Sequence, residues 1–151
     1  MSRHAINPFT RWFDEVQVGD RWRSRDRTVT RTDVDVYRGL SGDDRWGPSP
    51  PGGADDVVPE FLVLALGSAL VQPASYSTAV GLYGNDDMTW HHDAHVNDTL
   101  HVEIEIIDLE SRDDVGGVVT VWERIVDHAD RVVAEGMLRT MVRHRPPGDP
   151  A

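Results

Sequence analysis

The sequence predicts an α+β domain in which an antiparallel β-sheet curls around one buried helix. Three observations indicate this: residues 57–71 are apolar almost throughout, residues 100–122 carry strand-like patterns, and residues 132–143 resume that pattern after a polar turn. The chain has 151 residues, which is long enough to wrap a sheet around one helix but short for two cores. We therefore expect one domain over residues 1–145, followed by a flexible tail over residues 146–151.

Two helices are predicted. Residues 57–71 contain Pro59 near the first turn and apolar side chains on nearly every face, so this helix should be surrounded by protein. A shorter helix is predicted over residues 32–40, where Thr32 can cap the first turn and Asp35 follows three positions later. Between the helices the chain is rich in Gly, Pro and Asp, which predicts a loop.

The strands are predicted from the alternation of apolar and polar side chains. Leu100 to Ile106 alternate with His and Glu, and residues 118–122 are β-branched except for the closing Trp122. A period of two begins near Ala79. The strand segments that follow are 100–106, 118–122 and 132–143, with a hairpin at residues 127–130.

Composition excludes several classes of function. The formal net charge of −11 disfavours nucleic acid and anionic membrane surfaces as partners, because both are bound through Lys and Arg. The chain has no cysteine, which excludes disulfides, a thiolate nucleophile and a Cys-based zinc site. No apolar run is long enough to span a membrane, the N-terminus does not resemble a signal peptide, and no phosphate-binding Gly-rich motif is present. We expect a cytoplasmic protein without a cofactor.

Three blocks of sequence in order resemble the opening of the MaoC-like dehydratases and (R)-specific enoyl-CoA hydratases. These blocks are residues 13–20, 27–34 and 39–43, and residues 88–100 resemble a strand, turn and strand further along that family, with Asn97 at a position that is usually Gly. The resemblance covers roughly residues 12–145. It implies a single hot-dog domain, in which an antiparallel sheet wraps a central helix.

The resemblance also implies a catalytic pair that is incomplete here. In that family an Asp and a His five positions later add or remove water across a double bond conjugated to a thioester, which requires one group to move the α-proton and one to handle the hydroxyl. Asp43 falls on the Asp position, but Pro48 occupies the His position, and no His lies between His4 and His91. The ordinary family pair therefore cannot operate.

Candidate catalytic residues are Asp43 as acid or base and His91 or His92 as the substitute base. Candidate substrate-binding residues are Asp44, Trp46, Trp90, Tyr83 and Glu60. Most have a structural alternative: the acids can cap the loop, Trp90 and Tyr83 can pack in the core, and Glu60 can simply face the helix dipole. Trp46 lies among Gly and Pro and is harder to assign to a core.

A metal site is not predicted. His91, Asp93 and His95 would share one face of an extended strand, but side chains two apart on a strand lie about 6.5 to 7 Å apart, too far to share one ion without a kink.

Three functions follow from these residues. The first is a MaoC-like lyase acting on an acyl thioester or a polyketide-derived compound, including a divergent elimination, isomerisation or cyclisation in secondary metabolism. The second is a non-catalytic subunit that pairs with a partner carrying the complete catalytic pair. The third is a hot-dog thioesterase using Glu60. An unfilled sheet edge favours a homodimer, with a heterodimer as the alternative.

Overall fold

The computed structural model describes residues 7–43, 56–72 and 78–148. Over these residues two short 3₁₀ helices and two α-helices accompany one six-stranded sheet. The elements are η1 (Pro8–Thr10), η2 (Phe13–Glu15), β1 (Arg21–Arg23), β2 (Arg27–Thr28), α1 (Arg31–Ser41), α2 (Glu60–Val71), β3 (Ala79–Trp90), β4 (Thr99–Ser111), β5 (Gly116–Asp127) and β6 (Val132–Arg143). Neither α-helix in the described ranges has the length and apolarity needed to cross a membrane.

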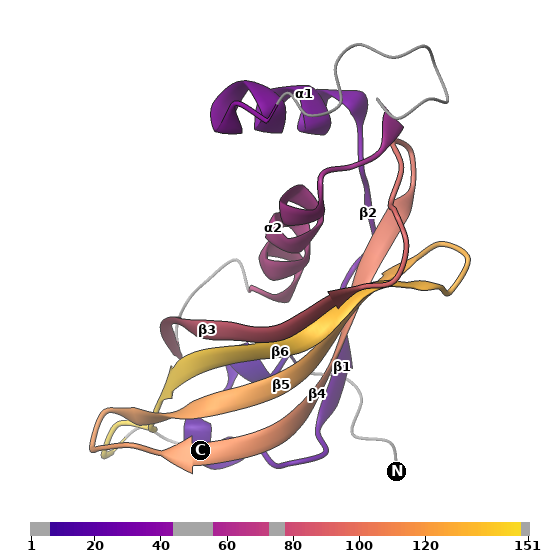
Figure 1. Ribbon diagram of the computed structural model, residues 1–151. Coiled ribbons are helices and arrows are strands. Elements are labelled where there is room, and N and C mark those ends of the chain that lie inside the picture. Colours follow the sequence, from indigo (N-terminus) through magenta and orange to yellow (C-terminus); the bar gives the residue numbers. More distant parts are fainter. Residues whose placement is uncertain (1–6, 44–55, 73–77, 149–151) are drawn as a thin grey trace.

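The sheet is antiparallel, in the order β1-β4-β5-β6-β3, with β2 pairing with β4 beside β1. The predicted strands are confirmed. The last one, β6, has the predicted bounds, whereas β4 and β5 are longer than the pattern indicated. The predicted hairpin closes where Asp127 N donates to the carbonyl of Arg131. Figure 1 shows α2 lying over one face of the sheet, with α1 beyond it and farther from the strands.

The central helix begins at Glu60, three residues later than predicted. Val57 instead forms an isolated β-bridge with His95, and Val58 N donates to the carbonyl oxygen of Ala94 at 2.8 Å. This extended pairing holds the chain out of the helix until Pro59 has been passed. It also ties the start of α2 to the segment that follows β3.

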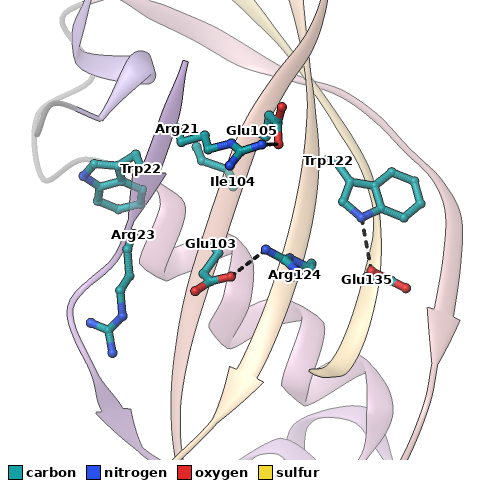
Figure 2. A pocket seen from close by; sticks show the side chains of 9 residues that line it. All are labelled: Arg21, Trp22, Arg23, Glu103, Ile104, Glu105, Trp122, Arg124 and Glu135. Atoms are coloured by element: carbon teal, nitrogen blue, oxygen red, sulfur yellow. Dashed lines mark hydrogen bonds and ion pairs between the residues drawn. The ribbon is translucent and has the colours of Figure 1, made fainter. Parts of the chain in front are cut away.

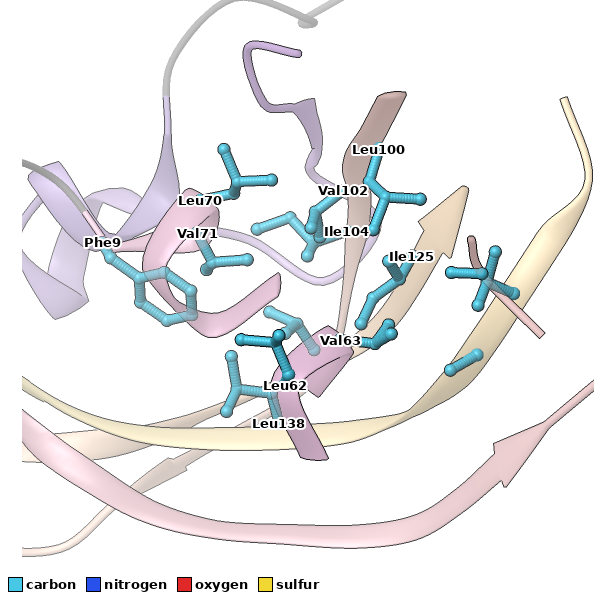
Figure 3. Packing of buried hydrophobic residues seen from close by; sticks show 14 of the residues in the cluster. Phe9, Leu62, Val63, Leu70, Val71, Leu100, Val102, Ile104, Ile125 and Leu138 are labelled. Carbon is cyan, nitrogen blue, oxygen red and sulfur yellow. The ribbon is translucent and has the colours of Figure 1, made fainter. Parts of the chain in front are cut away.

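One face of α2 forms the core and the other is uncovered. The buried residues of α2 pack on the sheet together with Ile125 and Leu138 (Figure 3). They are Leu62, Val63, Gly67, Leu70 and Val71. On the opposite face Phe61 is 63% exposed, and Ala65 and Ala69 are also exposed. The expectation that this helix is enclosed on every side is therefore wrong for a single chain.

The first α-helix starts earlier than predicted because a different threonine caps it. Thr30 accepts a hydrogen bond from Asp33 N, and the Asp33 carboxylate accepts one from Thr30 N, which completes a capping box. Thr32, the predicted cap, lies inside the helix. Along α1 only Val34 is buried, while Leu40 is 87% exposed.

Candidate active site

A pocket of about 190 Å³ lies between the start of α2 and the end of β3. Its walls come from Glu60 and Val63 of α2, from Trp90 and residues 91–94, and from Val133 of β6. The structure thus brings four predicted site residues, Glu60, Trp90, His91 and His92, to the border of one pocket. The Val57–His95 bridge explains the arrangement, because it draws residues 91–95 back along the start of the helix.

The imidazole of His92 lies beside a buried carboxylate. Its Nε2 atom is 3.8 Å from Asp127 Oδ2, and it has no hydrogen-bond partner within the described residues. The side chain of His92 is 31% exposed, whereas that of Asp127 is 1% exposed. In this pair the carboxylate of Asp127 is buried, whereas His92 borders a pocket that a ligand could enter.

Asp127 is held as a fixed anion. Its carboxylate accepts hydrogen bonds from the backbone N of Ala129 at 2.8 Å and of Arg131 at 3.0 Å, and it is paired with the Arg131 guanidinium at 2.7 Å. Burial alone would raise the pKa of Asp127, but these hydrogen bonds and the Arg131 charge outweigh it and hold the pKa below its usual value. The carboxylate next to His92 therefore stays ionised at neutral pH.

The ring of His91 contacts Glu135, which lies on the sheet face away from α2. Its Nε2 atom lies 2.9 Å from Glu135 Oε1, and the second oxygen of Glu135 accepts a hydrogen bond from the indole N–H of Trp122 at 3.1 Å. Glu135 and Trp122 line a different pocket. Of the two histidines predicted as substitute bases, His92 is thus the one whose ring nitrogen lies near the carboxylate of Asp127, at 3.8 Å.

That second pocket has a volume of about 520 Å³ and lies on the sheet face away from α2 (Figure 2). Its charged side chains largely neutralise one another: Arg124 pairs with Glu103 at 2.8 Å, and Arg21 pairs with Glu105 at 2.8 Å. Although this pocket is larger, most of its charged side chains are already paired with one another. The smaller pocket beside His92 is the better candidate active site.

Trp90 forms an aromatic wall of the smaller pocket. Its ring centroid lies 6.1 Å from that of Phe61, in a tilted arrangement. The indole Nε1 is buried without a hydrogen-bond partner among the described residues. Since a buried indole N–H usually finds an acceptor, this donor is available to a bound ligand.

The remaining predicted residues lie elsewhere. Asp43 follows the C-cap of α1, where its backbone N donates to Ser41 Oγ at 3.2 Å, and it does not line either pocket. Tyr83 is 52% exposed on β3, with the guanidinium of Arg139 5.5 Å from its ring centroid. Asp44, Trp46 and Pro48 lie outside the described residues.

The structure does not place His91, Asp93 and His95 on one strand face. The strand β3 ends at Trp90, and the chain then bends before the turn at Asn97, whose φ is 76°. Asn tolerates this left-handed conformation, which explains how it replaces a turn Gly. Within the described ranges no group of three His, Asp or Glu side chains is arranged to hold a metal ion.

Two acids were not predicted as site residues. Asp127 was interpreted only as part of a turn, and its contact with His92 depends on where β3 ends. Glu123 lies on β5 with 0% exposure. It shares the inward face of that strand with Val121 and Ile125, so an acid at an inward position of an alternating strand was a signal present in the sequence.

No protein-family model matches the sequence. The protein MaoC of Klebsiella aerogenes is 25% identical over 110 residues, which is 69% of this chain and 33% of MaoC. The chain therefore spans about a third of that relative's length.

Among solved structures, a MaoC-like dehydratase from Rhodospirillum rubrum superposes with a TM-score of 0.74 at 20% identity, covering 90% of this chain and 99% of that one. An (R)-hydratase from Pseudomonas aeruginosa gives a TM-score of 0.68 at 17% identity, covering 93% and 96%. The chain resembles the MaoC-like dehydratases in sequence and in fold. A Mycobacterium tuberculosis protein with a double hot-dog fold gives a TM-score of 0.70 at 17% identity, covering 93% of this chain and 46% of that one, so the hot-dog architecture predicted above is confirmed.

One further similar structure belongs to a protein with a different activity. A mutant of a thioesterase specific for fluoroacetyl-CoA superposes with a TM-score of 0.57 at 17% identity, covering 87% of this chain and 90% of that one. The fold alone therefore does not select between adding water to a double bond and hydrolysing a thioester.

Proposed function

We propose that this MaoC-like domain is a hydratase or dehydratase of an acyl thioester, with His92 as the base that replaces the one absent at Pro48. The observation that carries the proposal is the His92–Asp127 pair, at 3.8 Å, bordering a pocket at the start of the central helix. A histidine oriented by an ionised carboxylate is the usual arrangement for general acid–base work.

The roles of the pocket groups follow from the reaction. In hydration, His92 would take a proton from water as the oxygen attacks C3 of the enoyl thioester, and the electron pair of the double bond would move onto the thioester carbonyl. The N-terminus of α2 borders the pocket, where the helix dipole favours that developing negative charge. The imidazolium of His92 would then protonate C2.

The apolar surface supports a homodimer. Phe61, on the uncovered face of α2, is 63% exposed, and Leu82, on the edge strand β3, is 58% exposed. An unpaired strand edge bordered by exposed apolar side chains is the surface that a second copy of the chain covers. The Phe61 ring also contacts Trp90, so a partner seated there would lie next to the pocket.

The test is hydration of trans-2-butenoyl-CoA by the purified chain, with His92→Gln and the matched control His91→Gln. We expect His92→Gln to lower kcat by about 100-fold or more, and His91→Gln to leave it within a few-fold, because its ring faces Glu135 instead. Equal losses in both variants would remove the role given to His92. A well-folded wild type without activity would favour a non-catalytic subunit paired with a complete partner.

Thioester hydrolysis is the second candidate. It is favoured by the position of Glu60, which borders the pocket in the first turn of α2, and by the likeness to a hot-dog thioesterase. Release of free CoA from butanoyl-CoA, abolished by Glu60→Gln, would support this reaction. Hydration without CoA release would exclude it.

A further inference from the structure

The carboxyl group of Glu123 is buried under the central helix. Its side chain is 0% exposed, and neither oxygen has a hydrogen-bond partner within the described residues. Burial raises its pKa to about 7. Nearly all buried polar groups in native proteins are hydrogen-bonded, so an unpaired acid at the centre of a core calls for a partner that arrives from outside.

Two glycines lie next to Glu123. On the sheet it is flanked by Ile104 of β4 and Gly136 of β6, and Gly67 of α2 lies above it. A β-carbon on Gly67 would lie 3.6 Å from Glu123 Oε1. A β-carbon on Gly136 would lie 2.3 Å from the sulfur of Met88, so this side chain packs closely against Gly136. None of these neighbours is titratable or charged.

The two elements that line the candidate active site, α2 and β3, also carry the residues next to the Glu123 carboxyl. Val63, which lines the pocket, is followed one helical turn later by Gly67, and Trp90 is preceded two residues earlier by Met88. Met88 belongs to the edge strand β3, and its sulfur packs against Gly136. Methionine is flexible and unbranched, so its displacement would extend the pocket along α2 toward Glu123.

We propose that Glu123 recognises an oxygen atom on the distal part of the substrate's acyl chain, so that the substrate is a keto- or hydroxyacyl thioester rather than a plain alkyl one. This inference rests on the proposed function. The protonated carboxyl donates a hydrogen bond to a ketone, and either form accepts one from a hydroxyl. One helical turn of about 5.4 Å corresponds to roughly four carbon–carbon bonds beyond the part of the chain held at Val63.

The experiment measures binding of saturated thioesters, which cannot be hydrated. Octanoyl-CoA is compared with its 5-oxo, 6-oxo and 7-oxo derivatives by calorimetry, using the wild-type homodimer or monomer as purified. We expect one oxo derivative to bind at least 5-fold more tightly than octanoyl-CoA. Glu123→Leu should abolish that preference, and Glu123→Gln, whose amide still donates, should retain part of it.

Thr140→Val is the matched control, because it also removes a buried oxygen that lacks a partner among the described residues, on β6 and away from the pocket. It should leave the preference unchanged. If all four thioesters bind equally well to the wild type, or if Glu123→Leu keeps the preference, this inference is wrong and the proposed function stands. If no thioester binds, the proposed function fails and this inference fails with it.

Discussion

Gly67 of α2 packs directly against Ile125 of β5. A β-carbon added to Gly67 would lie 2.6 Å from Ile125 Cδ1 and 3.0 Å from its Cγ1, closer than carbon atoms approach in folded proteins. Ile125 is fully buried, so it has little room to yield. Glycine is unfavourable in a helix interior by about 1 kcal/mol relative to alanine. Its presence here lets the central helix approach the sheet closely.

The first prediction concerns that contact. Gly67→Ala should lower the free energy of unfolding by about 1 to 2 kcal/mol, because overpacking outweighs the gain in helix propensity. In an Ile125→Val background, which removes the Cδ1 atom, the same substitution should cost less. Urea unfolding of the four proteins in this double-mutant cycle measures the difference. Additive effects would show that the two residues do not press on each other.

The second prediction concerns the pH dependence of stability. Burial raises the pKa of Glu123 from 4.5 to about 7. Between these values the folded chain keeps a proton that the unfolded chain has released, so stability falls as pH rises from about 4.5, and the loss levels off above about 7. The full loss corresponds to about 3 kcal/mol.

Urea unfolding of the wild type and Glu123→Gln at about pH 5 and pH 8 tests this. The variant cannot ionise at this position, so the wild type should lose stability relative to it as pH rises. Other titrating groups are common to both proteins and cancel in the difference. If the free energies of unfolding of the two proteins change equally with pH, the carboxyl group of Glu123 contacts solvent or a partner in solution.

The third prediction concerns Asp127. Asp127→Asn should lower the free energy of unfolding by about 2 to 4 kcal/mol, since it removes a buried charge that the Arg131 guanidinium needs. Because the pKa of Asp127 is lowered in the folded chain, its contribution is present at neutral pH and is lost as pH falls below 3.8. Glu103→Gln, in a half-exposed pair with Arg124, is the control and should cost less than about 1 kcal/mol. Similar losses of stability in both variants would contradict the conclusion that the buried Asp127 carboxylate stabilises the turn between β5 and β6.

The fourth prediction concerns the proposed homodimer. Leu82→Glu, on the exposed edge of β3, should shift the chain from dimer to monomer in sedimentation experiments at micromolar concentration. Val115→Glu replaces a residue of comparable exposure, 54%, in the turn between β4 and β5 and should leave the dimer intact. A dimer that survives Leu82→Glu would place the interface elsewhere.

Local patterns predicted most of the fold. Alternation over residues 100–106 and the apolar run leading to Val71 are short-range signals, and both elements form, although the helix begins three residues later than predicted. The strands β1 and β2 are only three and two residues long and are fixed by pairing with β4, so no periodicity reveals them. The uncovered face of α2 was not predictable, because it depends on which neighbours are absent.

The site was predictable as a set of residues but not as an arrangement. Choosing His92 over His91 requires knowing that β3 ends at Trp90, which the Val57–His95 bridge determines. The partnership with Asp127 joins residues that lie far apart in the sequence. Glu123 could have been found, since an acid at an inward strand position is visible in the pattern of β5.

The most direct test of the central claim is whether an acyl thioester enters the pocket beside His92. The ring resonances of the histidines, assigned through His92→Gln and His91→Gln, are followed by NMR while butanoyl-CoA is added. We predict that the His92 signals shift and saturate, while those of His91, held by Glu135 on the opposite face, stay in place. Shifts confined to His91, or no shift at all, would contradict the assignment of this pocket as the active site.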